Sequence, residues 1–160
     1  MRINAKVMKS LLTAVVLFTC LTTSAQIQVK KDADGFLEGR NYKGAGVWVM
    51  LFVRVHPGQE NLYFNYLADV WKRQQEALKK EGIILSYKVL QANAGHKEDY
   101  NVVLMTEYAS RTAMDENSAK ADTIVRGIVG TDEKMAEAFR DREKVRKIFG
   151  GKITREIILR

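Results

Sequence analysis

The stretch "VWVMLFVRVHPGQENLYFNYL", residues 47 to 67, joins two hydrophobic patterns at one Pro-Gly pair. Residues 47 to 56 form a run of β-branched, aromatic and aliphatic side chains, which predicts a strand of central type that ends at Pro57. Beyond Gly58, apolar residues recur every three or four positions as far as Leu78, which is typical of an amphipathic helix. The stretch therefore predicts a strand followed at once by a helix that stops near Gly82.

The rest of the chain continues the same alternation. Strands are expected over 83–92, 100–108 and 152–160, and the turn "NAGHKED" joins the first two into a hairpin. Helical spacing covers 118–129, and a second helical piece starts at Thr131 and is expected to end near Gly150. The order is βαββαβ with the second helical segment broken in two. It predicts a ferredoxin-like α+β fold, an antiparallel sheet with helices on one face.

The first 25 residues predict a secretory signal peptide. Arg2, Lys6 and Lys9 precede an apolar run over 11–21, and the small residues before Gln26 form a cleavage site that ends at Ala25. A lipoprotein modified at Cys20 is the alternative, but Phe and Thr precede that cysteine where small residues are preferred. The run is shorter than the roughly 20 residues a bilayer needs, and no later stretch is long and uncharged enough to span one. We therefore expect an exported protein, periplasmic or secreted, with no transmembrane segment after cleavage.

After the predicted signal peptide, residues 26–45 are interpreted as a polar tether and residues 46–160 as one folded domain. Cys20 is the only cysteine, so the mature chain would have neither a disulfide nor a cysteine metal site. Its net charge would be +4, from 23 basic and 19 acidic residues. The excess lies in 140–160, interpreted as a solvated helix end, with an anionic ligand as the alternative. Nucleic acid is not an expected partner.

The two faces of the strand over 47–56 differ in what can cover them. The odd positions Val47, Val49, Leu51, Val53 and Val55 can pack under the helices, whereas Trp48, Met50 and Phe52 project from the uncovered face. Burying each of these three would contribute about 1.5–3 kcal/mol. This favours a second copy as the cover, and two sheets face to face would form a barrel.

With these elements the chain resembles the dimeric α+β barrel superfamily, including antibiotic-biosynthesis monooxygenases and stress-responsive barrel proteins. The resemblance covers about 46–160 and rests on the element order and on "VHPGQENLYFNYL", "EGIILSYKVL" and "GGKITREIIL". It implies a homodimeric barrel. These are architectural features, and the scaffold supports many chemistries, so the resemblance does not assign an activity.

Candidate site residues follow from the strand faces. The even positions Trp48, Met50, Phe52, Arg54 and His56 would form a wall that changes from apolar to basic. Such a wall fits a pocket for a small aromatic or amphipathic molecule with an anionic end. The alternative, slightly favoured because a strand's apolar face is usually packing, is that Trp48, Met50 and Phe52 are plain dimer core and that Arg54 and His56 reach solvent.

Two tyrosines are further candidates. Tyr87 and Tyr108, with Glu107, are expected to approach the polar end of the first strand, where they would either contact a substrate or serve as half-buried wall residues.

The resemblance suggests His56 as a haem ligand or general base, but the only other histidine, His96, lies in a distant turn. We therefore expect no metal and no cofactor. The mature sequence contains no Ser-His-Asp order, paired-carboxylate signature, phosphate loop or cysteine nucleophile. Two functions remain: an exported, non-enzymatic module that binds a small apolar or amphipathic ligand between the sheets, or a cofactor-independent, monooxygenase-like oxidoreductase.

Overall fold

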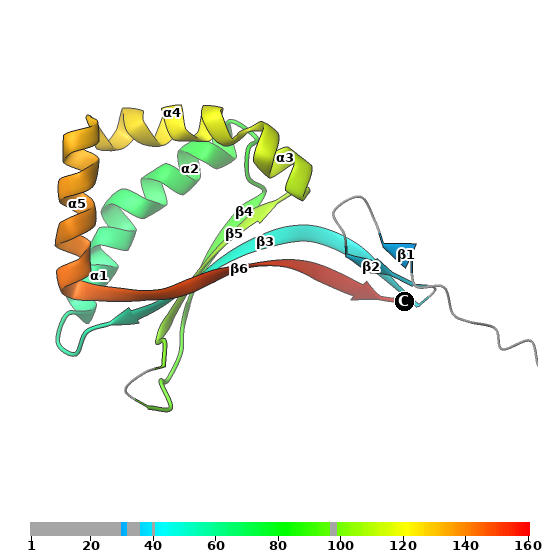
Figure 1. Ribbon diagram of the computed structural model, residues 1–160, viewed down its shortest axis with the longest axis horizontal. Helices are drawn as coiled ribbons and strands as arrows, with labels where there is room; N and C mark the ends of the chain where they lie inside the picture. The colour runs from blue at the N-terminus through cyan, green and yellow to red at the C-terminus, as the bar shows by residue number, and fades with distance from the viewer. Residues whose placement is uncertain (1–29, 32–35, 40, 97–98) are drawn as a thin grey trace, which may run out of the picture.

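The computed structural model describes residues 30–31, 36–39, 41–96 and 99–160. The predicted signal peptide lies outside these residues, as do residues 26–29, 32–35 and 40 of the predicted tether. Four strands form one antiparallel sheet in the order β4-β5-β3-β6: β3 is Tyr42–Val55, β4 is Ser86–Gln91, β5 is Val102–Tyr108 and β6 is Arg146–Leu159. A separate pair of short strands, β1 (Lys30–Lys31) and β2 (Leu37–Glu38), lies near the start of β3 and the end of β6 (Figure 1).

The helices gather on one side of the sheet (Figure 1). Three consecutive pieces connect β3 to β4: α1 (Glu60–Tyr66), the π-helical turn η1 (Leu67–Trp71) and α2 (Lys72–Lys80). Three more connect β5 to β6: α3 (Arg111–Glu116), α4 (Ser118–Val129) and α5 (Asp132–Val145). The order of elements, with β3 and β5 central and β4 and β6 at the edges, confirms the ferredoxin-like α+β fold.

Two predicted boundaries are wrong, and for the same reason. β3 begins at Tyr42 instead of 47, and β6 begins at Arg146 instead of 152, so α5 stops earlier than expected. The two strands pair along their whole length, from Tyr42 opposite Leu159 to Val55 opposite Arg146. Because of this long pairing, the glycine-containing segments 44–46 and 150–151 become part of the strands. The register is irregular near Gly44 and Phe52.

Helix α3 was not predicted. Ser110 caps its first turn by accepting a hydrogen bond from the Ala113 backbone N–H at 3.0 Å. Its six residues are too short to show a hydrophobic period, so a capping residue was the only signal available in the sequence.

The main core lies between α1–η1 and the centre of the sheet. Its buried members are Val53, Val55, Tyr63, Leu67, Val102 and Leu104. The expected packing of odd β3 positions under the helices is therefore confirmed for Val53 and Val55. A second cluster of Leu78, Ile83 and Ile84 packs against α4. None of the described helices is long and apolar enough to cross a membrane.

Candidate functional site

The strand register defines which side chains share the sheet face opposite the helices. Trp48, Met50 and Phe52 stand opposite Glu107, Met105 and Val103 of β5, and opposite Thr154, Lys152 and Gly150 of β6. Directly opposed residues in an antiparallel pair point to the same side of the sheet. Because Val53 and Val55 point toward the helices, these even positions face away from them. We call this surface the open face.

The middle row of the open face combines apolar and cationic side chains. Read across the four strands it is Lys88, Met105, Met50 and Lys152. The Lys88 Nζ lies 4.7 Å from the centroid of the Trp48 ring, and Trp48 is only 7% exposed. The Lys152 Nζ lies 6.0 Å from the Phe52 centroid. The open face thus has an apolar centre with a lysine on each edge strand.

These two lysines were missed as site residues in the sequence analysis. The alternation of strands 83–92 and 152–160 would assign them to a face, but only the register shows that this is the face of Met50.

The expected position of Glu107 and Tyr108 near the polar end of the first strand is wrong. Antiparallel pairing places them opposite Trp48 and Val47, at the other end of the first strand from Arg54. Glu107 accepts a hydrogen bond from the Ser86 hydroxyl on β4. The carboxylate therefore belongs to the Trp48 end of the open face.

The two candidate tyrosines lie on the helix-covered side. The Tyr87 hydroxyl donates to Glu76 of α2, and the Tyr87 ring meets Trp71 edge-on at 5.4 Å. Tyr108 packs against the cluster of Leu78, Ile83 and Ile84, and burial raises its pKa. The sheet separates both tyrosines from Trp48, Met50 and Phe52.

Arg54 and His56 extend the first strand toward its other end. The Arg54 guanidinium donates from Nη1 to the Asp99 carbonyl oxygen at 3.1 Å, so one of its donors is already bonded to the loop that contains Asp99. His56 follows β3 and lines a cavity of about 410 Å³ with the end of α5 and the start of β6. The structure therefore does not place His56 beside the apolar centre of the open face.

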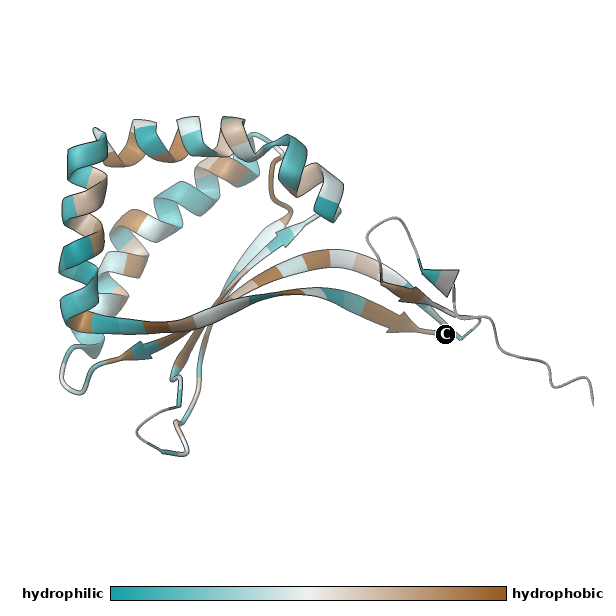
Figure 2. Ribbon diagram, in the orientation of Figure 1, coloured by the Kyte–Doolittle hydropathy of each residue, from teal (hydrophilic) through white to brown (hydrophobic). Residues whose placement is uncertain are grey.

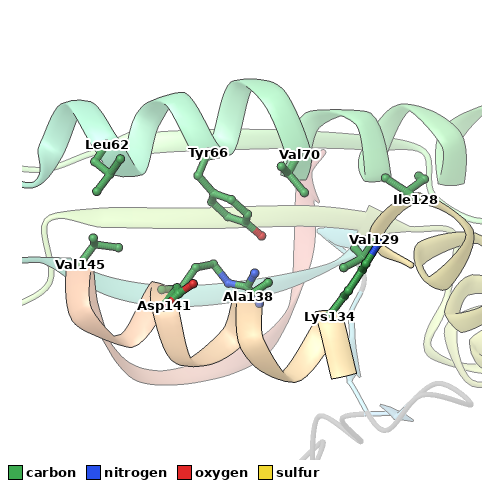
Figure 3. A pocket seen from close by; sticks show the side chains of 10 residues that line it. Leu62, Tyr66, Val70, Ile128, Val129, Lys134, Ala138, Asp141 and Val145 are labelled. Carbon is green, nitrogen blue, oxygen red and sulfur yellow. The ribbon is translucent and has the colours of Figure 1, made fainter. Parts of the chain in front are cut away.

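A second cavity, of about 440 Å³, lies in the helical layer. It is lined by residues of α1, η1, α4 and α5: Leu62, Tyr66, Val70, Ile128, Val129, Lys134, Ala138, Asp141, Arg142 and Val145. In Figure 3, Leu62, Tyr66 and Val70 are directed toward α5, from which Ala138 and Val145 face them. Sequence periodicity indicates that each helix has an apolar stripe, but not that these stripes line a common, open cavity.

Within the described ranges, no group of three His, Cys, Asp or Glu side chains could hold a metal ion.

Comparison with known proteins finds no protein-family model and no curated protein sequence that matches the chain. Among solved structures, it is similar to HapK from Hahella chejuensis, with 12% identity, a TM-score of 0.46, and 68% of this chain and 90% of that one covered. Two dimeric ferredoxin-like proteins from an uncultured marine organism share 13% and 15% identity, with TM-scores of 0.45 and 0.43. Each alignment covers 74% of this chain, and 90% and 98% of the other. By its own strand order and one-sided helical layer, the chain is a small α+β protein of ferredoxin-like fold.

Proposed function

We propose that the protein is a homodimeric binding module that holds a small anionic, amphipathic molecule between the open faces of two copies. The observation that carries this proposal is the row of Lys88, Met105, Met50 and Lys152 across the sheet. Its apolar centre suits the body of such a molecule, and its flanking ammonium groups suit a carboxylate or sulfonate.

Trp48 and Val103 are already buried within one copy, whereas Met50, Phe52 and Met105 are partly exposed, and a second copy is the partner that best accounts for these three. In a two-fold dimer the same face is used twice, so an apolar centre on one copy meets an apolar centre on the other. The edge strand β6 also ends in exposed apolar residues, with Leu159 80% exposed, and this hydrophobic end is visible in Figure 2. Long apolar edge strands favour association with another chain.

The charges of the open face favour a ligand over a dry interface. Two-fold assembly would bring Lys88 and Lys152 of both copies toward one enclosed space, where like charges repel more strongly than in water. An anion between the sheets would offset that repulsion and pair with ammonium groups that are costly to bury alone.

Light scattering combined with titration of anilinonaphthalene sulfonate tests the proposal. We expect a dimer at micromolar concentration and saturable fluorescence enhancement that aromatic acids reverse. Lys152→Met should weaken binding of the probe about tenfold or more, because it removes a charge-assisted contact. Lys79→Met is the matched control, because Lys79 is exposed on α2 and does not reach the open face.

A monomer, or a dimer whose probe affinity does not respond to Lys152→Met, would contradict the binding proposal. Oxygen consumption with a hydroquinone-like substrate would instead support the monooxygenase-like alternative, provided that the rate fell with Lys152→Met and not with Lys79→Met.

We also propose that the protein is exported and cleaved after Ala25, on the basis of the charged start, apolar run and small-residue site of residues 1–25. Expression of the full chain in a bacterium with a secretion pathway should give an extracytoplasmic product that begins at Gln26. Intact mass measures this directly. An uncleaved cytoplasmic chain, or a lipid-modified product beginning at Cys20, would show that the cleavage site is misassigned.

A further inference from the structure

We propose that the cavity between α1–η1 and α4–α5 is a second binding site, which takes a monoanion with an aliphatic body, such as a medium-chain carboxylate. The cavity lies in the helical layer, on the other side of the sheet from the open face. It is independent of dimerisation, because the helices of one copy supply all the residues that line it.

The walls of this helix-layer cavity are mainly aliphatic. Leu62 and Val70 come from the first helical segment, Ile128 and Val129 from the end of α4, and Ala138 and Val145 from α5. Its volume of about 440 Å³ falls toward the lower end of the range of about 300–1,000 Å³ typical of small-molecule sites. A smaller cavity of about 140 Å³ shares Tyr66, Val129 and Arg142 with it. The space and its lining suit a short hydrocarbon chain.

Arg142 supplies an unsatisfied donor at this cavity. Its Nε is shielded from solvent and has no hydrogen-bond partner among the described residues. The guanidinium carbon lies 5.0 Å from the centroid of the Tyr66 ring, which also lines the cavity and holds the cation in place. A donor buried without a partner is unfavourable, so a shift of the Arg142 side chain that brings Nε to the carboxylate of a ligand would satisfy it.

The charge balance around the cavity selects an anion. Asp141 is the one acidic lining residue, and its carboxylate already accepts a hydrogen bond from Lys144 at 2.8 Å. That bond and the lysine charge hold the pKa of Asp141 below its usual range. Arg142 and Lys134 are the cationic lining residues. A carboxylate would therefore meet a net positive rim, whereas an amine would be repelled.

A local irregularity of the first helical segment coincides with this cavity. Tyr66 ends α1, and the π-helical turn η1 follows at once, with the Lys72 N–H bonded to the Leu67 carbonyl. Val70, within η1, lines the cavity beside Tyr66. π-Helical turns are uncommon and frequently mark functional sites, because the wider turn redirects side chains that a regular α-helix would space differently.

Calorimetric titration of the full-length protein with decanoate tests the site. We expect one decanoate bound per chain, and binding of decanol, which has no charge, at least about tenfold weaker. Arg142→Met should lower the decanoate affinity to that of decanol. Arg140→Met is the matched control: Arg140 is exposed on the same helix and does not line the cavity, so its loss changes the net charge equally without changing binding.

A filling variant separates this site from the open face. Ala138→Phe should remove decanoate binding at this site by occupying the cavity, while Lys152→Met should leave binding at this site unchanged. The proposal is overturned if decanoate gives no binding at millimolar concentration, or if decanol binds as tightly. It is equally overturned if binding survives both Arg142→Met and Ala138→Phe, whereas loss through Lys152→Met alone would place the carboxylate on the open face.

Discussion

Phe52→Asp is expected to convert the proposed homodimer into folded monomers. Phe52 lies near the centre of the open face, between Val103 of β5 and Gly150 of β6, and its ring contacts the Tyr100 ring in a tilted arrangement with 4.8 Å between centroids. The substitution removes an apolar side chain from the interface once in each copy, at a cost of about 1.5–3 kcal/mol each, and the new carboxylate must be desolvated even though Lys152 lies close to it. The dissociation constant should therefore rise by roughly a hundredfold to ten-thousandfold. Light scattering across a dilution series measures the change.

The matched control is Phe139→Asp, the same substitution at an exposed position of α5 in the helical layer. It should remain dimeric. Circular dichroism should show that both variants keep their helices. If Phe52→Asp remained a stable dimer, or if Phe139→Asp dissociated equally, assembly through the open face would be refuted.

The second large effect concerns the stability of the protein at high pH. Tyr63 is 1% exposed and packs in the main core, and burial raises the pKa of its hydroxyl to about 12. The nearby Arg146 and Arg142 act in the opposite direction without cancelling the effect of burial. Because the folded state holds this proton more tightly than the unfolded chain, the stabilising contribution is complete below pH 10. It is lost as the pH rises from about 10 to 12.

The expected loss from Tyr63 over that interval is about 2–3 kcal/mol in the free energy of unfolding. Urea unfolding of the wild type and of Tyr63→Phe, at several pH values from 9 to 12, measures it. Other groups also titrate in this range, so the difference between the two proteins isolates Tyr63. A constant difference across the series would mean that the Tyr63 proton is held no more tightly in the folded chain.

Much of the fold could be read from local patterns in the sequence. Strand and helix periods differ clearly on either side of Pro57-Gly58, and the helix over 118–129 has the boundaries that its spacing predicts. The amphipathic pattern after Gly58 predicted the first helical segment, although not its π-helical turn, because the apolar residues on both sides of that turn still recur every three or four positions. The segment over 146–151 was misassigned because its strand character depends on a partner 90 or more residues away, in β3.

Part of the candidate site could likewise be predicted from local patterns in the sequence. The alternation along residues 47 to 56 was enough to separate Trp48, Met50 and Phe52 from the core residues Val53 and Val55, because side-chain direction in a strand has a fixed period. Sequence by itself thus determined the order of elements, the ferredoxin-like class and the apolar character of the open face.

Only the tertiary structure decided which distant side chains meet. The register of β5 against β3 moved Glu107 and Tyr108 away from Arg54, and the pairing with β4 and β6 set Lys88 and Lys152 beside the open-face methionines. The packing of α5 against α1 then formed the open cavity beside Arg142. Local patterns report the direction of each side chain relative to its own element. Register and packing depend on contacts between segments far apart in the chain, and no local period encodes those contacts.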